Sequence, residues 1–107
     1  MINILNAQKI IELLKEVKNI ERGESKMKVT QLSKDEYKTI INNYTIYVKI
    51  HRDSDLTTLE STMRYENLGL ALDDLPHIAK SILKDDKPAY EILQSIHNIF
   101  MNIDKYL

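Results

Sequence analysis

The sequence predicts a single small α+β domain, residues 1–107, with a sheet of about three strands covered by an N-terminal helix and a C-terminal helical hairpin. Apolar residues recur at the three- and four-residue spacing of amphipathic helices over 6–22 and 88–106. They alternate with polar residues over 44–51, as in a half-buried strand. Because both helices must bury an apolar stripe, a sheet with one apolar face is their natural partner.

The first helix is predicted over 6–22, and a short strand follows it over 26–32. Asn6 stands where a side-chain oxygen accepts an otherwise unpaired backbone N–H at a helix start. Gly23 stands just past the end, where a left-handed residue closes the last turn. The strand is indicated by its alternating polar and apolar side chains.

The segment 34–41 allows two interpretations. Ser33 and Glu36 have the spacing of a capping box, which favours a short helix and is the prediction we adopt. The alternative is a hairpin that turns at Asn42 and Asn43 into the following strand.

The stretch 56–72 is also ambiguous. Leucines alternate with other residues toward its end, so a strand is predicted through 62–72, with an irregularity near Asn67. The alternative is a helix that begins after Asp55.

Two helices, 75–84 and 88–106, are predicted to close the chain as an antiparallel hairpin. Asp74 is placed to cap the first, and Pro88 fits the first turn of the second. Inward positions of all these elements give the predicted core: Ile10, Leu14, Val17, Ile46, Val48, Ile50, Leu70, Ile82, Ile92, Ile96 and Phe100.

Composition excludes several classes of chemistry. The chain has no cysteine, which removes disulfides, thiolate metal sites and thiol catalysis. No stretch approaches the roughly 20 apolar residues of a membrane helix, so we expect a soluble, cytoplasmic protein. The net charge is only −1, but residues 22–52 carry seven basic against three acidic residues, and residues 53–89 carry four against eight.

Short patterns that suggest catalysis or metal binding are incomplete. His51-Arg52-Asp53 matches part of a kinase catalytic loop, but Thr58 stands where that loop needs asparagine. Read as a calcium loop from Asp53, the chain has Thr58 and Arg64 where glycine and glutamate are required.

His77 and His97 lie on neighbouring predicted helices but have no ligand-like spacing. The two glycines lie too far apart for a phosphate loop. We therefore predict no catalytic residue, metal or cofactor, while a site dispersed in sequence stays open.

The expected function is that of a non-enzymatic interaction protein that occludes or regulates a larger macromolecule. Small inhibitors made by phages and mobile elements against host nucleic-acid enzymes share this profile. Exposed carboxylates can imitate a phosphate track and steer a basic partner. The predicted partner-binding residues are acidic Asp53, Asp55, Asp73, Asp74, Asp85 and Asp86, with Tyr47, Lys49 and Arg52 as a second surface.

Two further interpretations concern partners. The basic region 22–52 suggests nucleic-acid binding as the alternative function, with Tyr47 stacking on a base. The wide apolar stripe of the last helix makes a homodimer as plausible as a monomer.

Overall fold

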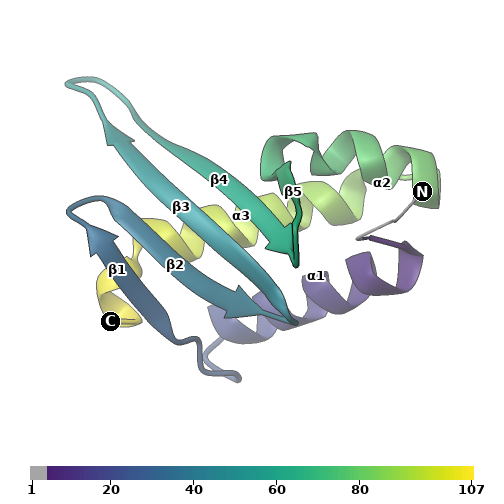
Figure 1. The fold of residues 1–107 in the computed structure, drawn as a ribbon, viewed down its shortest axis with the longest axis horizontal. Coiled ribbons are helices and arrows are strands. Elements are labelled where there is room, and N and C mark those ends of the chain that lie inside the picture. The colour runs from purple at the N-terminus through teal and green to yellow at the C-terminus, as the bar shows by residue number, and fades with distance from the viewer. Residues whose placement is uncertain (1–4) are drawn as a thin grey trace.

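A computed structural model describes residues 5–107 and confirms the α+β class (Figure 1). The first half contains one helix and three strands. The second half adds two more strands before the C-terminal helices. In chain order the elements are α1 (Ala7–Glu21), β1 (Val29–Ser33), β2 (Glu36–Ile41), β3 (Tyr44–Arg52), β4 (Thr57–Tyr65), β5 (Leu68–Ala71), the 3₁₀ turn η1 (Leu72–Asp74), α2 (Leu75–Leu83), α3 (Lys87–Met101) and the 3₁₀ turn η2 (Ile103–Lys105).

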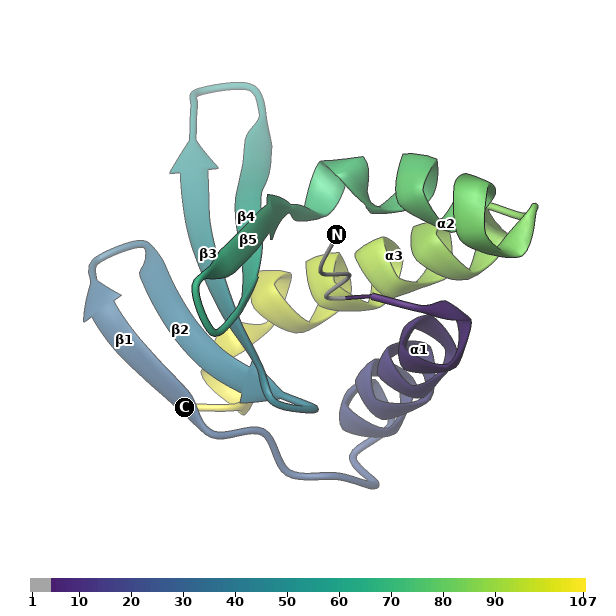
Figure 2. The same cartoon turned by 45° about the vertical axis from the view of Figure 1, so that its right-hand side comes forward.

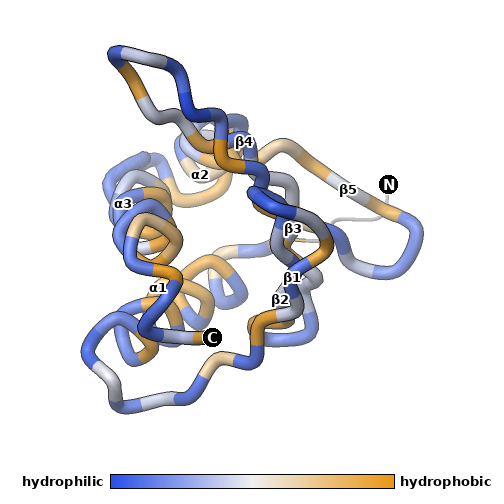
Figure 3. The backbone as a smooth tube through the Cα atoms, turned by 90° about the vertical axis from the view of Figure 1, so that its left-hand side faces the viewer, coloured by the Kyte–Doolittle hydropathy of each residue, from blue (hydrophilic) through white to orange (hydrophobic). Residues whose placement is uncertain are grey.

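Within the described residues the strands form one antiparallel sheet in the order β1-β2-β3-β4-β5, so it has five strands where about three were predicted. The helices lie on one side of this sheet (Figures 2 and 3). α1 and α3 pack on each other, and α3 runs back along α2 as the predicted helical hairpin (Figure 1). No helix of residues 5–107 combines the length and apolar character needed to cross a membrane.

Strand β3 confirms the predicted alternation and sets the two faces of the sheet. Tyr44, Ile46, Val48 and Ile50 are buried against the helices, while the side chains between them point to the outer face. One face of this antiparallel sheet is therefore core and the other is solvated.

Helix α1 confirms both predicted ends. The Asn6 side chain accepts a hydrogen bond from the Lys9 backbone N–H at 2.9 Å, and Gly23 adopts φ +78°. The buried stripe differs by one residue from the predicted core, because Leu13 is fully buried and Leu14 is only half-buried. The strand that follows begins at Val29 and not at residue 26.

The predicted helix at 34–41 is wrong, and the hairpin alternative is confirmed. Ser33 pairs with Glu36 across a tight turn, so the apparent capping box joins β1 to β2. Asn42 and Asn43 adopt φ 49° and 70°, the left-handed pair that a two-residue hairpin turn requires. Asparagine tolerates this region better than most residues, which explains why the chain turns there.

Substitutions at Asn43 test this turn. We expect Asn43→Gly to leave the free energy of unfolding nearly unchanged, because glycine adopts positive φ freely. Asn43→Val is expected to cost about 1–2 kcal/mol, because its Cβ crowds the backbone in that region. Urea unfolding followed by circular dichroism measures both, and equal stability of the two variants would contradict the turn assignment.

The predicted strand at 62–72 is two strands. β4 begins at Thr57, and a tight turn at Glu66 and Asn67 reverses the chain into β5. Glu66 adopts φ 56°, so the irregularity expected near Asn67 is a hairpin turn. The alternative helix after Asp55 is also wrong.

The C-terminal helices begin and end slightly differently from the prediction. Asp74 occupies the N-cap position of α2, but its side chain makes no capping hydrogen bond. α3 ends at Met101 and not at residue 106.

Most of the predicted core is confirmed. Ile82, on the outer side of α2, is 37% exposed, and Leu70 in the short β5 is only half-buried, so both predictions were wrong. The predicted residues that are buried are Ile10, Val17, Ile46, Val48, Ile50, Ile92, Ile96 and Phe100.

Candidate functional site

The predicted acidic residues do not form one surface. Asp53 and Asp55 are exposed beyond the end of β3, at the tip of the β3–β4 hairpin. That tip and the connection between α2 and α3 lie at different ends of the molecule (Figures 1 and 2). The other four lie around α2: Asp73 and Asp74 in η1, and Asp85 and Asp86 before α3.

Two of these aspartates share a surface hollow. We call it the α2–α3 hollow, because its lining residues come from η1, α2 and the start of α3.

 The α2–α3 hollow has a volume of about 560 Å³. It is lined by Asp73, Pro76, His77, Lys80, Asp86, Tyr90 and Leu93.

The two aspartates before α3 differ in what their side chains do. The Asp85 carboxylate accepts a hydrogen bond from the Lys87 backbone N–H at 3.0 Å, at the start of α3. Asp86 occupies the N-cap position of the same helix but makes no side-chain capping bond. Of this pair, Asp85 is therefore the residue whose side chain satisfies a backbone N–H at the start of α3.

The second predicted surface is divided between the two faces of the sheet. Tyr47 and Lys49 lie on the outer face, whereas Arg52, at the end of β3 and paired with Thr57, alternates to the helical side. On the outer face, Tyr47 and Lys49 line a small hollow of about 150 Å³. Three side chains in or near this part of β3 have acidic neighbours, which lowers their attraction for a further anion. The pairs are Lys49 with Glu36 at 4.0 Å, His51 with Glu60 at 3.0 Å, and Arg52 with Asp35 at 2.9 Å.

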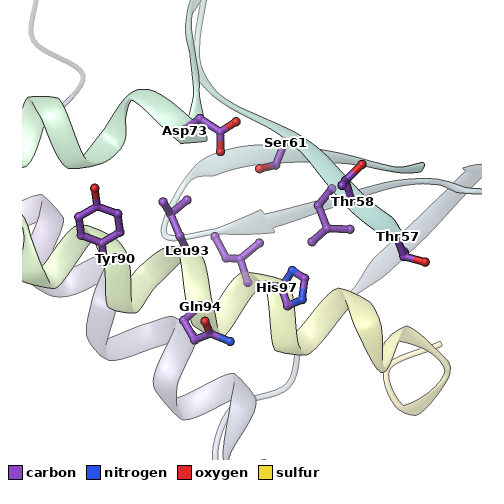
Figure 4. Close-up of a pocket in the computed structure, with 10 residues that line it drawn as sticks. Thr57, Thr58, Ser61, Asp73, Tyr90, Leu93, Gln94 and His97 are labelled. Carbon is purple, nitrogen blue, oxygen red and sulfur yellow. The ribbon is translucent and has the colours of Figure 1, made fainter. Parts of the chain in front are cut away.

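A groove between β4 and α3 was missed by the sequence analysis (Figure 4). It encloses about 420 Å³, within the range of about 300–1,000 Å³ that is usual for binding sites. Strand residues form one wall and helix residues the other. This β4–α3 groove is lined by Thr57, Thr58, Leu59, Ser61, Asp73, Tyr90, Leu93, Gln94, Ile96 and His97.

Alternation along β4 supplies the strand wall. Leu59 pairs with the buried Ile50 of β3, so its side chain points to the helical side of the sheet. Thr57 and Ser61, two residues away on either side, point the same way and are half-buried. The groove lies where these side chains are only partly covered by α3.

The same stretch of β4 has an open backbone edge. β5 pairs only with Thr62–Tyr65, because the chain leaves the sheet at Leu72 and enters η1. Within residues 5–107, no strand pairs with Thr57–Glu60 on the side opposite β3.

Hairpin geometry shows which backbone groups face this edge. The Asp53 N–H donates to the Leu56 carbonyl at 2.9 Å. Because hydrogen-bonded pairs alternate along an antiparallel ladder, the backbone N–H and C=O groups of Thr58 and Glu60 also face β3. The intervening residues, Thr57 and Leu59, therefore direct their N–H and C=O groups away from β3. Both residues present a donor and an acceptor to the open edge.

The helix wall combines an apolar floor with a polar rim. Ile96 is buried and Leu93 half-buried, while Tyr90 is 57% exposed. Figure 4 shows Asp73 and Tyr90 toward one end of the groove, and Thr57 and His97 toward the other. Apart from His97, Asp73 is the one acidic or basic residue among the described residues that line the groove.

In comparisons with family models, curated proteins and solved structures, nothing matches this chain. Within the part of the chain that the structure describes, no three His, Asp or Glu residues are grouped as a metal site. The geometry therefore defines a small α+β domain with a groove beside an open sheet edge, and function is inferred from that geometry.

Proposed function

We propose that this chain is a non-enzymatic interaction domain that binds an extended segment of a larger partner protein and so occludes or regulates it. The open backbone edge at Thr57 and Leu59, directly beside the β4–α3 groove, is the observation that carries this proposal. An extended segment that adds a strand there gains main-chain hydrogen bonds from the edge and side-chain contacts from the groove.

The dimensions suit a short segment. From Thr57 to Ser61 the edge spans about 14 Å, at about 3.4 Å for each residue of a strand. The apolar floor, formed by Leu59, Leu93 and Ile96, offers a place for an apolar side chain of the segment. Such a segment would cover both the unpaired backbone and this floor.

Protection of the sheet edges also differs in a way that supports the proposal. Proteins usually guard an exposed edge with lysine, proline or a bulge. β1, at the other edge, is interrupted by an irregularity between Gln31 and Ser33. The stretch Thr57–Ser61 contains no lysine, proline or bulge.

Catalysis is the less supported function. Ser61, Asp73 and His97 share the groove and are residue types found in hydrolases. No hydrogen bond links any two of these described residues, whereas a nucleophile and its base are usually within hydrogen-bond reach. Nucleic-acid binding through 22–52 is also less supported, because Lys49 and Arg52 already have acidic neighbours.

Amide hydrogen exchange tests the proposal on the unaltered protein. Peptides that bind are first selected from a random displayed library and then synthesised. We expect a bound peptide to slow exchange at Thr57 and Leu59, whose N–H groups face the open edge. Thr58 and Glu60 are the internal controls, because their N–H groups already face β3. Failure to select any peptide, or unchanged exchange at Thr57 and Leu59, would overturn the proposal.

Edge variants give a second test. Leu59→Pro removes one edge donor, and we expect at least about a tenfold loss of peptide affinity, while Leu59→Val keeps the donor and most of the affinity. Circular dichroism checks that each variant is folded. If Leu59→Pro does not fold, Thr57→Pro against Thr57→Val makes the same comparison at the first residue of β4.

A further inference from the structure

The two ends of the β4–α3 groove differ in what surrounds them. At the Ser61 end, β5 stops and η1 carries the chain into α2. At the Thr57 end, the strand runs on toward the exposed tip of the β3–β4 hairpin (Figures 1 and 4). A guest strand therefore has one end beside η1 and the other beside the hairpin tip.

Strand polarity favours one orientation of the guest. β5 runs antiparallel to β4 and points along the open edge. A guest that continues this line also runs antiparallel to β4, and antiparallel pairs are slightly more stable than parallel ones. Its N-terminal end then lies beside Ser61 and η1.

The charge at that end favours a cation. Asp73 is exposed, lies in η1 and takes part in none of the ion pairs among the described residues. It lines both the β4–α3 groove and the α2–α3 hollow. A carboxylate so placed attracts a positive side chain and repels a negative one.

Room and an aromatic surface for such a side chain lie next to Asp73. Tyr90 and Leu93 line both the groove and the α2–α3 hollow, so the two spaces adjoin. The exposed Tyr90 ring suits a cation–π contact. Lys80 and His77 also line the hollow, so an acidic side chain is the competing occupant.

Resting on the proposed function, we infer that the partner segment runs antiparallel to β4 and places a lysine or arginine near its N-terminal end, beside Asp73 and Tyr90. Apolar side chains follow at alternate positions, over the floor formed by Leu93 and Ile96. The partner is thus an extended segment with a basic residue ahead of an alternating apolar stretch.

Peptide selection against three forms of the protein tests the charge. Wild type is expected to enrich lysine or arginine at one position, Asp73→Asn to lose that preference, and Asp73→Lys to enrich aspartate or glutamate instead. For a selected basic peptide, Asp73→Asn should lower affinity about three- to tenfold. Because Asp73 is exposed, these variants should keep the fold, as circular dichroism can check.

Orientation is tested with a spin label on the peptide's N-terminus, which should broaden the amide signals of Ser61 more than those of Thr57. A second outcome is that the selected peptides slow amide exchange at Leu59 and yet show no preference for a basic residue, or prefer an acidic one. That result overturns the charge assignment and leaves the proposed function standing. Stronger broadening at Thr57 overturns the orientation alone. If no peptide binds, the proposed function fails, and this inference fails with it.

Discussion

Replacing Phe100 by alanine is expected to lower the free energy of unfolding by about 3–5 kcal/mol, because it opens a cavity between the two layers of the fold. Phe100 is fully buried in α3 and is the one phenylalanine of the chain. Its ring centroid lies 6.3 Å from that of Tyr37 in β2, an aromatic contact that joins helix to sheet.

Urea unfolding of Phe100→Ala beside Met101→Ala measures this effect. Met101 is the next residue of the same helix but is 36% exposed, so its truncation should cost clearly less. A domain of this kind has a total stability of about 5–15 kcal/mol, so the Phe100 variant should lose a large fraction of it. Similar costs for the two variants would contradict the assigned core.

The helices could be predicted because their signals are local. In α1, Asn6 and Gly23 mark the two ends, and the spacing of Ile10 and Val17 marks the buried face. The one-residue error arose because Leu13 and Leu14 are adjacent leucines that lie three and four residues after Ile10, so both fit the helical spacing. Only packing against α3 and the sheet decides which of them is covered.

The sheet was predicted less well because local and long-range signals disagree. Ser33 and Glu36 have the local spacing of a helix cap, but Tyr37, Thr39 and Ile41 are buried at every second position, as a strand requires. Pairing with β3 prevails, since the helix would remove that ladder. The buried Thr39 hydroxyl donates to the Lys28 carbonyl at 2.8 Å, a contact that no local pattern indicates.

The groove could not be predicted from sequence because it depends on the relative lengths of β4 and β5. It exists because β5 is shorter than β4, so Thr57 and Leu59 lack a second neighbour. The β-branched residues Thr57, Thr58 and Thr62 were the available signal for a strand there. The chain leaves the sheet at Leu72, and the position of this exit depends on tertiary packing and not on a local sequence pattern.

A carboxylate joins the end of α1 to α3 and makes the stability of the domain depend on pH. Glu21 accepts hydrogen bonds from the Asn98 side-chain amide at 2.7 Å and from the buried Ser95 hydroxyl at 2.9 Å. The bond from Asn98 is the largest cause of a lowered Glu21 pKa; burial opposes it, and the bond from Ser95 adds to it. The charged form of Glu21 is therefore favoured by folding.

Because the folded-state pKa lies below the ordinary value of 4.5, the stabilisation from Glu21 is present above that pH and is lost as pH falls through the folded-state pKa. We expect Glu21→Gln to cost about 1–2 kcal/mol at neutral pH, where neutral hydrogen bonds replace charge-assisted ones. Urea unfolding across a pH series should show this difference shrinking as the medium becomes acidic. Glu24→Gln is the matched control, since Glu24 is exposed and contacts only Arg22 among the ion pairs of the described residues. A Glu21→Gln deficit that stays constant with pH would show that the side chain acts through packing and not through its charge.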